Sequence, residues 1–398
     1  MKKFIIPLLI LATVVSIILA GCTQPATPTT PTTPTTPTVP TTPTTPTTPT
    51  TPSEPSQPEP VMNPYEGLGI KPDGTPYRFA HVPLFLYNEW VAMGHGYLMS
   101  VFNRAGATID LFNSNLDAAV EMATLQDIQA NKYDGIAILP VDSASAGASI
   151  DSLWAAGIPA VSWDYRPASD NLLCHCEEDQ YLLGQVGGQF FADYVERTGE
   201  PLKILELWAS MAQDGCIRRH NGFHSVVDGN PLITVVESAP TNHALEPAQT
   251  IVLDQFSADP ELNALWAMAD TYEGYTQGLA FCDRRIRIGD PGHVVIFTGP
   301  GEPGALQALR DGIVDAVGSM SCWVECDLVS KALLTYVCLG EDVPSEQFVP
   351  PIMIGPDDTE QPYLYGNMRG VPFDDWPIIP DSYYESRGFF DYIPTPSK

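Results

Sequence analysis

Along the middle of the chain, short apolar runs alternate with longer segments in which apolar residues recur at helical spacing. Runs such as Gly135–Leu139 and Pro159–Asp164 are short and largely apolar, as buried strands are. Segments such as Tyr181–Glu196 repeat apolar residues three and four positions apart, which places them on one side of a helix. Strands that alternate with helices of roughly ten to fifteen residues predict βαβ units and a parallel sheet.

This alternation occurs in two consecutive stretches of the chain. The first stretch predicts strands at 78–83, 108–111, 135–139 and 159–164, with helices at 89–104, 116–131, 143–156 and 181–196. The second predicts strands at 202–207, 233–237, 262–268 and 294–297, with helices at 217–227, 246–256, 273–281 and 304–310. Two open parallel sheets in one chain direct the loops at their carboxyl ends toward a shared crevice, where such folds bind ligands.

The charge of the chain excludes one class of partner. There are 19 Lys and Arg residues against 48 Asp and Glu residues, which gives a formal net charge of −29. A nucleic-acid backbone would be repelled, because its binding needs clustered positive charge. The hydrophobic fraction of 44% is enough for a sizeable core, so we expect the acidity to belong to a folded surface.

The N-terminus has the layout of an export signal. Met1–Lys3 is positive, Phe4–Leu19 is apolar, and small residues follow. The junction Leu19–Cys22 resembles that of a bacterial lipoprotein, which implies a signal peptide at 1–21 and acylation of the Cys22 sulfur. The alternative is an uncleaved membrane anchor, although the run is short against a bilayer span of roughly 20 residues.

Residues 22–62 consist almost wholly of Thr and Pro. Such a segment cannot form a core, and we expect an extended, polyproline-like, disordered tether. With the signal, it predicts a protein anchored by lipid on the extracytoplasmic face of a bacterial membrane, at the cell surface or in the periplasm.

Five segments resemble one known family in the same order. They are 134–143, 157–164, Glu178-Asp179 with Gly184, Arg218–Phe223 and 311–317. Together they are similar to the type I periplasmic binding proteins, in the ribose- and galactose-binding branch of ABC importers. The resemblance implies an α/β fold of two doubly wound parallel-sheet lobes, joined by a three-strand hinge that permits closure around a ligand.

The resemblance also implies domain boundaries. The solute-binding domain would span 63–354, with lobe one at about 77–178 plus 323–349 and lobe two at about 180–318 plus 350–354. Residues 355–398 form an aromatic-rich extension beyond the family pattern, which we expect to lie across the body near the hinge or to contact a partner.

A sugar presents hydroxyl groups and an apolar ring face, so its binder needs charged or amide groups together with aromatic rings. By the resemblance, the ligand-binding residues are Asn88, Trp90, Asp164, Tyr165, Arg166, Arg219, Asp270, Thr298 and Met320. Asp164 matches a hydroxyl-binding carboxylate, and Arg219 matches an arginine that reaches the ligand from the second lobe. Either Tyr165 or Arg166 can occupy the position where the family has arginine.

Several of these residues have a plainer interpretation. Asn88 and Asp164 can cap helices or loops, Trp90 can be a core aromatic, and Arg219 can belong to a surface ion pair. Three positions also depart from the family pattern, namely Ala269 before Asp270, Thr298, and Met320 beside Ser319. These departures remove much of the hydrogen-bonding set for pentoses and hexoses, and predict a different sugar, a polyol or a less hydroxylated molecule.

Other chemistry is weakly represented. The motifs Gly-x-Ser-x-Gly and His-Glu-x-x-His and the Walker loop do not occur in the sequence, so we predict neither an enzyme nor a cofactor. The segment Cys174–Glu178 and the pair His220 and His224 carry no full ligand set at a recognised spacing, and we predict no metal site. Disulfides are permitted in an exported protein, but the pairing of its cysteines stays open.

The function that these observations predict is capture of a sugar-like solute and its delivery, by a monomeric lipoprotein, to an ABC transporter permease. A receptor that presents a bound small molecule to a membrane signalling protein is the first alternative. A cleft enzyme of unrecognised type is the second.

Overall fold

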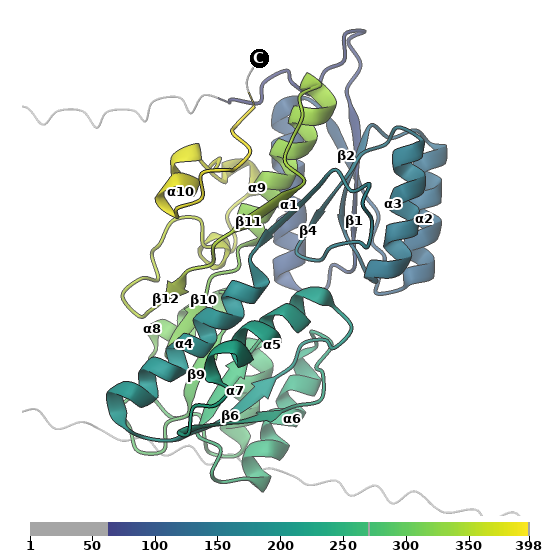
Figure 1. The fold of residues 1–398 in the computed structure, drawn as a ribbon. Coiled ribbons are helices and arrows are strands. Elements are labelled where there is room, and N and C mark those ends of the chain that lie inside the picture. The colour runs from purple at the N-terminus through teal and green to yellow at the C-terminus, as the bar shows by residue number, and fades with distance from the viewer. Residues whose placement is uncertain (1–62, 270, 397–398) are drawn as a thin grey trace, which may run out of the picture. The chain divides into compact units, whose positions relative to one another are not determined.

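The computed structural model describes residues 63–269 and 271–396. The predicted signal peptide, the tether, Cys22 and Asp270 lie outside the described residues. Two six-stranded sheets organise the described chain, and helices cover both faces of each sheet (Figure 1). The predicted fold class, two α/β lobes built on parallel sheets, is confirmed.

The sheet of lobe one has the strand order β11-β5-β4-β3-β1-β2, and all its pairings are parallel. Its strands are β1 (Arg78–Pro83), β2 (Thr108–Leu111), β3 (Gly135–Leu139), β4 (Ala160–Trp163), β5 (Cys174–Glu178) and β11 (Glu346–Val349). Alternate residues of a strand point to opposite faces. Phe79 therefore packs with α1 (Glu89–Ala105) and α9 (Cys322–Leu333), while Ala80 packs with α2 (Ala118–Ala130) and α3 (Ser143–Ala155).

The sheet of lobe two has the order β12-β10-β9-β8-β6-β7, in which only β12 is antiparallel. Its strands are β6 (Leu202–Leu207), β7 (Ile233–Glu237), β8 (Ala264–Ala267), β9 (Val295–Thr298), β10 (Ala316–Gly318) and β12 (Met353–Ile354). One face packs on α4 (Gln180–Thr198) and α5 (Asp214–Val227). The other packs on α6 (Leu245–Ala258), α7 (Tyr272–Phe281) and α8 (Pro303–Arg310).

The chain passes between the lobes after β5, after β10 and after β11, and the C-terminal segment later returns from lobe two to lobe one. The Asp179 amide, after β5, donates a hydrogen bond to the Val349 carbonyl at the end of β11. The Ser319 amide, after β10, donates one to the Ile352 carbonyl after β11. These backbone bonds hold the three connections side by side.

Three elements of lobe one were not predicted from the sequence, namely β5, β11 and α9. β5 reads Cys-His-Cys-Glu-Glu, and all five residues are buried although they lack the apolar run of an interior strand. α9 is buried along its whole length, including Glu325, Asp327 and Lys331, so none of its faces is open to solvent. It continues into the π-helical turn η1 (Leu334–Leu339).

The seven described cysteines are all free thiols. Cys174 and Cys176 lie on one face of β5 with their sulfur atoms 3.6 Å apart.

The C-terminal segment packs on lobe one after passing along lobe two. It contains η2 (Tyr365–Met368), η3 (Phe373–Asp375) and α10 (Asp381–Ser386). Trp376 is buried against Tyr97 and Trp323, and the Tyr384 hydroxyl donates to Asp327 at 2.7 Å. Arg387 reaches the connection after β5, where it pairs with Glu178 at 2.7 Å. The aromatic residues of this segment therefore contribute to the core of the domain.

Candidate ligand-binding site

A narrow pocket with a cavity volume of about 20 Å³ lies where the two lobes meet. A cavity of this size holds about one water molecule, so a sugar-sized ligand requires the two lobes to move apart. Its lining consists of Leu84, Phe85, Asn88, Trp90, Val91, Leu139, Asp164, Tyr165, Arg219, His243, Ala269, Pro300 and Met320. The lining residues up to Tyr165 belong to lobe one, and those from Arg219 to Pro300 belong to lobe two. Met320 lies in the connection after β10.

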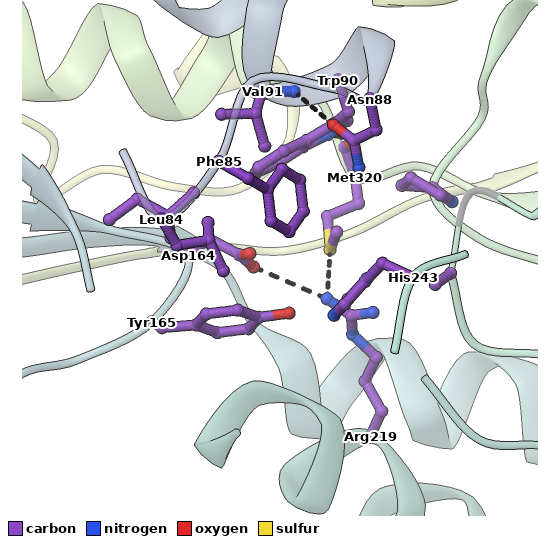
Figure 2. Close-up of a pocket in the computed structure, with 13 residues that line it drawn as sticks. Leu84, Phe85, Asn88, Trp90, Val91, Asp164, Tyr165, Arg219, His243 and Met320 are labelled. Atoms are coloured by element: carbon purple, nitrogen blue, oxygen red, sulfur yellow. Dashed lines mark hydrogen bonds and ion pairs between the residues drawn. The ribbon is translucent and has the colours of Figure 1, made fainter. Parts of the chain in front are cut away.

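Asp164 and Arg219 face each other across this pocket (Figure 2). Asp164 follows β4, Arg219 lies on α5, and the Asp164 Oδ1 atom is 3.5 Å from the Arg219 Nη2 atom. Gln180 bridges the pair, since its Nε2 donates to Asp164 at 2.7 Å and its Oε1 accepts from the Arg219 Nε at 2.5 Å. A carboxylate of lobe one and a guanidinium of lobe two thus meet at one point.

Asp164 has an unusual backbone and an unusual acidity. Its φ of 57° lies in the left-handed region, where an L-residue is held only when the surroundings require it. Burial raises the pKa of the Asp164 carboxyl to about 7, although the positive charge of Arg219 lowers it. The carboxyl therefore changes charge near neutral pH.

Arg219 is 1% exposed, and all its donors have partners within the protein. Besides Gln180, its Nη1 donates to the Met268 carbonyl at 2.6 Å, and its Nη2 lies 3.0 Å from the Met320 sulfur. A thioether is a weak acceptor compared with a hydroxyl or a carboxylate. An oxygen atom of a ligand would therefore be a stronger hydrogen-bond acceptor for Nη2 than this sulfur.

Aromatic rings form the apolar part of the pocket. Trp90 stacks on Trp163 with ring centroids 4.9 Å apart, and its Nε1 donates to the Met320 carbonyl at 2.9 Å. In the view of Figure 2, the ring of Phe85 lies above the Asp164–Arg219 pair and that of Tyr165 below it. Tyr165 is buried beside Gly215 of α5, at which a Cβ atom would come within 2.7 Å of its ring.

The structure assigns the other predicted residues to different places. Asn88 lines the pocket, but its Oδ1 also caps α1 by accepting from the Val91 amide at 2.9 Å. Arg166 lies outside the pocket, in an ion pair with Glu346. Thr298 is buried outside the lining, and its hydroxyl donates to the Gly299 carbonyl at 3.3 Å. Of the pair Tyr165 and Arg166, only Tyr165 contributes to the lining.

The lining residues that were not predicted include Leu84, Phe85, Val91, Leu139 and His243, and two of these five carry a ring that faces the pocket. Phe85 lies in the short loop after β1. Nothing in the surrounding sequence distinguishes this phenylalanine from the aromatic residues of the core. His243 has a φ of 59° in the loop before α6, and its Nε2 donates to the Gln213 Oε1 at 2.7 Å. Burial, together with the positive charge of Arg219, lowers the pKa of His243 to about 4, so its imidazole is neutral at pH 7.

The family described as periplasmic binding protein domain matches residues 79–341, which is more than half of the chain, and the chain belongs to this family. The ribose import binding protein of Escherichia coli (strain K12) is 23% identical over 53% of this chain and 68% of its own length. That relative is a binding protein rather than an enzyme.

Solved structures share the fold. An ABC transporter solute-binding protein from Mycobacterium smegmatis, with bound glycerol, has a TM-score of 0.64 at 21% identity, over 72% of this chain and 96% of its own. A galactofuranose-binding protein has a TM-score of 0.67 at 17% identity, over 75% of this chain and the whole of its own. Among the described residues, none of the helices has the length and apolar character needed to cross a membrane.

Proposed function

We propose that this protein captures a sugar or sugar-like molecule between its lobes and delivers it to an ABC importer. The single observation that carries the proposal is that Asp164 and Arg219, from different lobes, meet in one pocket. An ionised carboxylate accepts hydroxyl hydrogens, and the guanidinium fork donates to ring or hydroxyl oxygens. A ligand held by both groups links the lobes and favours their closed arrangement.

The shape and polarity of the pocket support a ligand with one apolar face. Phe85, Trp90 and Tyr165 offer aromatic surface, while Leu84 and Met320 offer no strong hydrogen bond. Few polar groups besides Asp164, Arg219, Asn88 and His243 line the pocket. A furanose, a polyol or a deoxygenated sugar fits this set better than a pyranose with hydrogen bonds to every hydroxyl.

A ligand screen on the purified full chain tests the proposal. Sugars, polyols, amino acids and nucleosides are added in turn, and the thermal unfolding midpoint is measured. A ligand at about 100 times its dissociation constant stabilises the protein by roughly 2.7 kcal/mol. We expect one sugar or polyol class to raise the midpoint, and Asp164→Asn and Arg219→Gln to give a much smaller rise at the same ligand concentration.

The matched control is Arg197→Gln, which removes an exposed arginine from the last turn of α4. This variant is expected to keep the full ligand response. If only amino acids or nucleosides raise the midpoint, the sugar part of the proposal is wrong. If a sugar raises it equally in the Asp164 and Arg219 variants, the ligand binds elsewhere.

The transport role and the receptor alternative differ in what is lost on gene deletion. Loss of uptake of the bound solute supports delivery to an importer. Intact uptake with an altered transcriptional or motility response to the solute supports a receptor, and conversion of the bound solute to a product supports an enzyme.

The lipid anchor at Cys22 is part of the proposal. Its support is the sequence Leu19–Cys22 and the Thr and Pro tether that follows. Cys22→Ala is expected to release the protein from the washed membrane fraction, and mass spectrometry of the N-terminal peptide is expected to show acyl chains on Cys22. An unmodified Cys22 in a membrane-bound chain would favour an uncleaved anchor.

A further inference from the structure

Lobe two contains a cluster of one carboxylate and two imidazoles that lies outside the ligand pocket. Glu206 is on β6, and His220 and His224 are one turn apart on α5. Both Glu206 oxygens lie 3.1 Å from the His220 Nδ1, and its Oε2 lies 3.1 Å from the His224 Nε2. The sequence alone predicts no metal site, because the histidine pair has no third ligand at a recognised spacing. The tertiary structure supplies it from β6.

The spacing of these atoms fits a tetrahedral metal ion. Metal–ligand bonds of about 2.0–2.1 Å at tetrahedral angles place ligand atoms roughly 3.3–3.4 Å apart. The observed separations of 3.1 Å between Glu206 and each histidine are close to this value, and one ligand atom from each of the three residues lies within 4.8 Å of the others. Small side-chain rotations would open the space for the ion.

The surroundings of the cluster orient its histidines. The His224 Nδ1 lies 2.8 Å from the Asp228 carboxylate, which fixes the ring so that its Nε2 atom faces Glu206. Histidine ligands commonly donate their second ring N–H to a carboxylate in this way. Trp208 covers His220 with ring centroids 4.6 Å apart and is itself held by a bond from its Nε1 to Glu237.

Charge and access also favour a cation. Glu206 is completely buried, and a buried carboxylate needs compensating positive charge. His220 and His224 are about one-fifth exposed, so an ion has a path from solvent and a water molecule can complete its coordination. Two imidazoles and a carboxylate are ligands that suit Zn²⁺ and neighbouring divalent transition metals.

We propose that Glu206, His220 and His224 form a binding site for one divalent transition-metal ion, with Zn²⁺ as the best match. The ion would fasten α5 to β6. Because Arg219 directly precedes His220 in the chain, the same ion would fix the part of α5 that carries Arg219 into the ligand pocket. This site does not depend on the identity of the solute.

The test uses the full chain, stripped with a chelator and titrated with Zn²⁺. Metal content by elemental analysis is expected to show one ion per chain, and calorimetry to show a saturable site. The loss of a carboxylate that holds a histidine ligand typically weakens metal binding about 10–100-fold. We expect Asp228→Asn to weaken Zn²⁺ binding by a factor in this range, and His224→Gln, which removes a ligand, to weaken it more. Co²⁺ in place of Zn²⁺ is expected to give the visible spectrum of a four-coordinate ion.

His293→Gln is the matched control. His293 also pairs with a carboxylate, that of Asp315 at 2.9 Å, but the described residues place no third ligand with it. This variant is expected to keep one Zn²⁺ per chain at unchanged affinity. His220→Gln, at a side chain that is 21% exposed, provides a second ligand variant that leaves the buried Glu206 in place.

Two results would overturn the proposal. One is the absence of saturable Zn²⁺ binding to the stripped chain. The other is saturable binding that His220→Gln and His224→Gln leave unchanged. Either result would identify the cluster as a set of hydrogen bonds that only satisfies the buried Glu206 carboxylate.

Discussion

Helix α5 makes two very different sets of contacts, one within lobe two and one across to lobe one. On the first side, a Cβ atom at Gly222 would lie 2.0 Å from the Tyr181 carbonyl oxygen of α4, and one at Gly184 of α4 would lie 2.0 Å from the Arg219 carbonyl oxygen. On the second side, Gly215 faces the ring of Tyr165, and Arg219 faces Asp164 at 3.5 Å. The first set joins backbone to backbone, whereas the second joins side chains that can separate.

This difference shows how one helix serves both rigidity and recognition. Close backbone packing fixes α5 within its lobe, because protein interiors yield little to added volume. The contacts across the pocket depend on the approach of the lobes, and a ligand can replace or extend them. Changes at the two sides of α5 should therefore affect different measurements.

The largest effect is expected for Gly222→Ala. The added methyl group meets the backbone of α4, so the helices must separate. Overpacking costs typically 1–3 kcal/mol, and a backbone obstacle places this change near about 3 kcal/mol. Chemical denaturation of the ligand-free chain measures the loss. Unchanged stability would show that α4 and α5 can move apart as easily as the side chains that meet between the lobes.

Arg219→Ala is expected to come next. It leaves the buried Asp164 without its guanidinium, and breaking a buried ion pair usually costs 3–5 kcal/mol, which we reduce to about 2 kcal/mol because Asp164 can take up a proton. The folded-state pKa of Asp164 is raised above its unfolded value, so protonation relieves the variant at low pH. The loss should therefore be greater at pH 8 than at pH 6, as denaturation at both values can show.

Gly215→Ala is expected to separate binding from stability. Alanine favours a helix over glycine by about 1 kcal/mol, so the ligand-free chain should keep or gain stability. The new methyl group would contact the Tyr165 ring and hold the lobes apart, which should weaken ligand binding about tenfold or more, or roughly 1.4 kcal/mol. Calorimetry measures the affinity for the solute. Equal affinities of Gly215→Ala and the unmodified chain would show that the lobes do not approach each other at the Gly215–Tyr165 contact when the ligand binds.

The smallest effect is the pH dependence of binding. Hydroxyl recognition needs ionised Asp164, and with a pKa of about 7 its ionised fraction falls about fourfold between pH 8 and pH 6.5. The affinity for the solute should fall by a similar factor as the pH decreases. In Asp164→Asn, the weaker residual affinity should show no such change over this range.

Much of the fold followed from periodicity alone. The strands predicted at 108–111, 135–139, 202–207 and 233–237 coincide with β2, β3, β6 and β7. Their apolar runs are bounded by polar turns, so their limits are visible locally. β5 and α9 were not predicted, because both carry charged or polar residues at positions that the fold buries.

The site was predictable only in part. Asp164 and Arg219 were named from the resemblance, and the structure brings them together; Arg166 and Thr298 were also named, and they lie outside the pocket. The lining residue His243 has no local signal, since its position depends on a loop in the left-handed conformation and on Gln213 30 residues away.

The sequence by itself determined the alternation of strands and helices, the acidic surface and the export signal that it predicts, because these depend on residues near one another in the chain. Only the tertiary structure decided which distant groups meet. It placed Asp164 opposite Arg219, brought Glu206 to His220 and His224, and packed the C-terminal aromatics on α1 and α9. These contacts join segments that periodicity treats separately, and their geometry is set by how the sheets and helices pack.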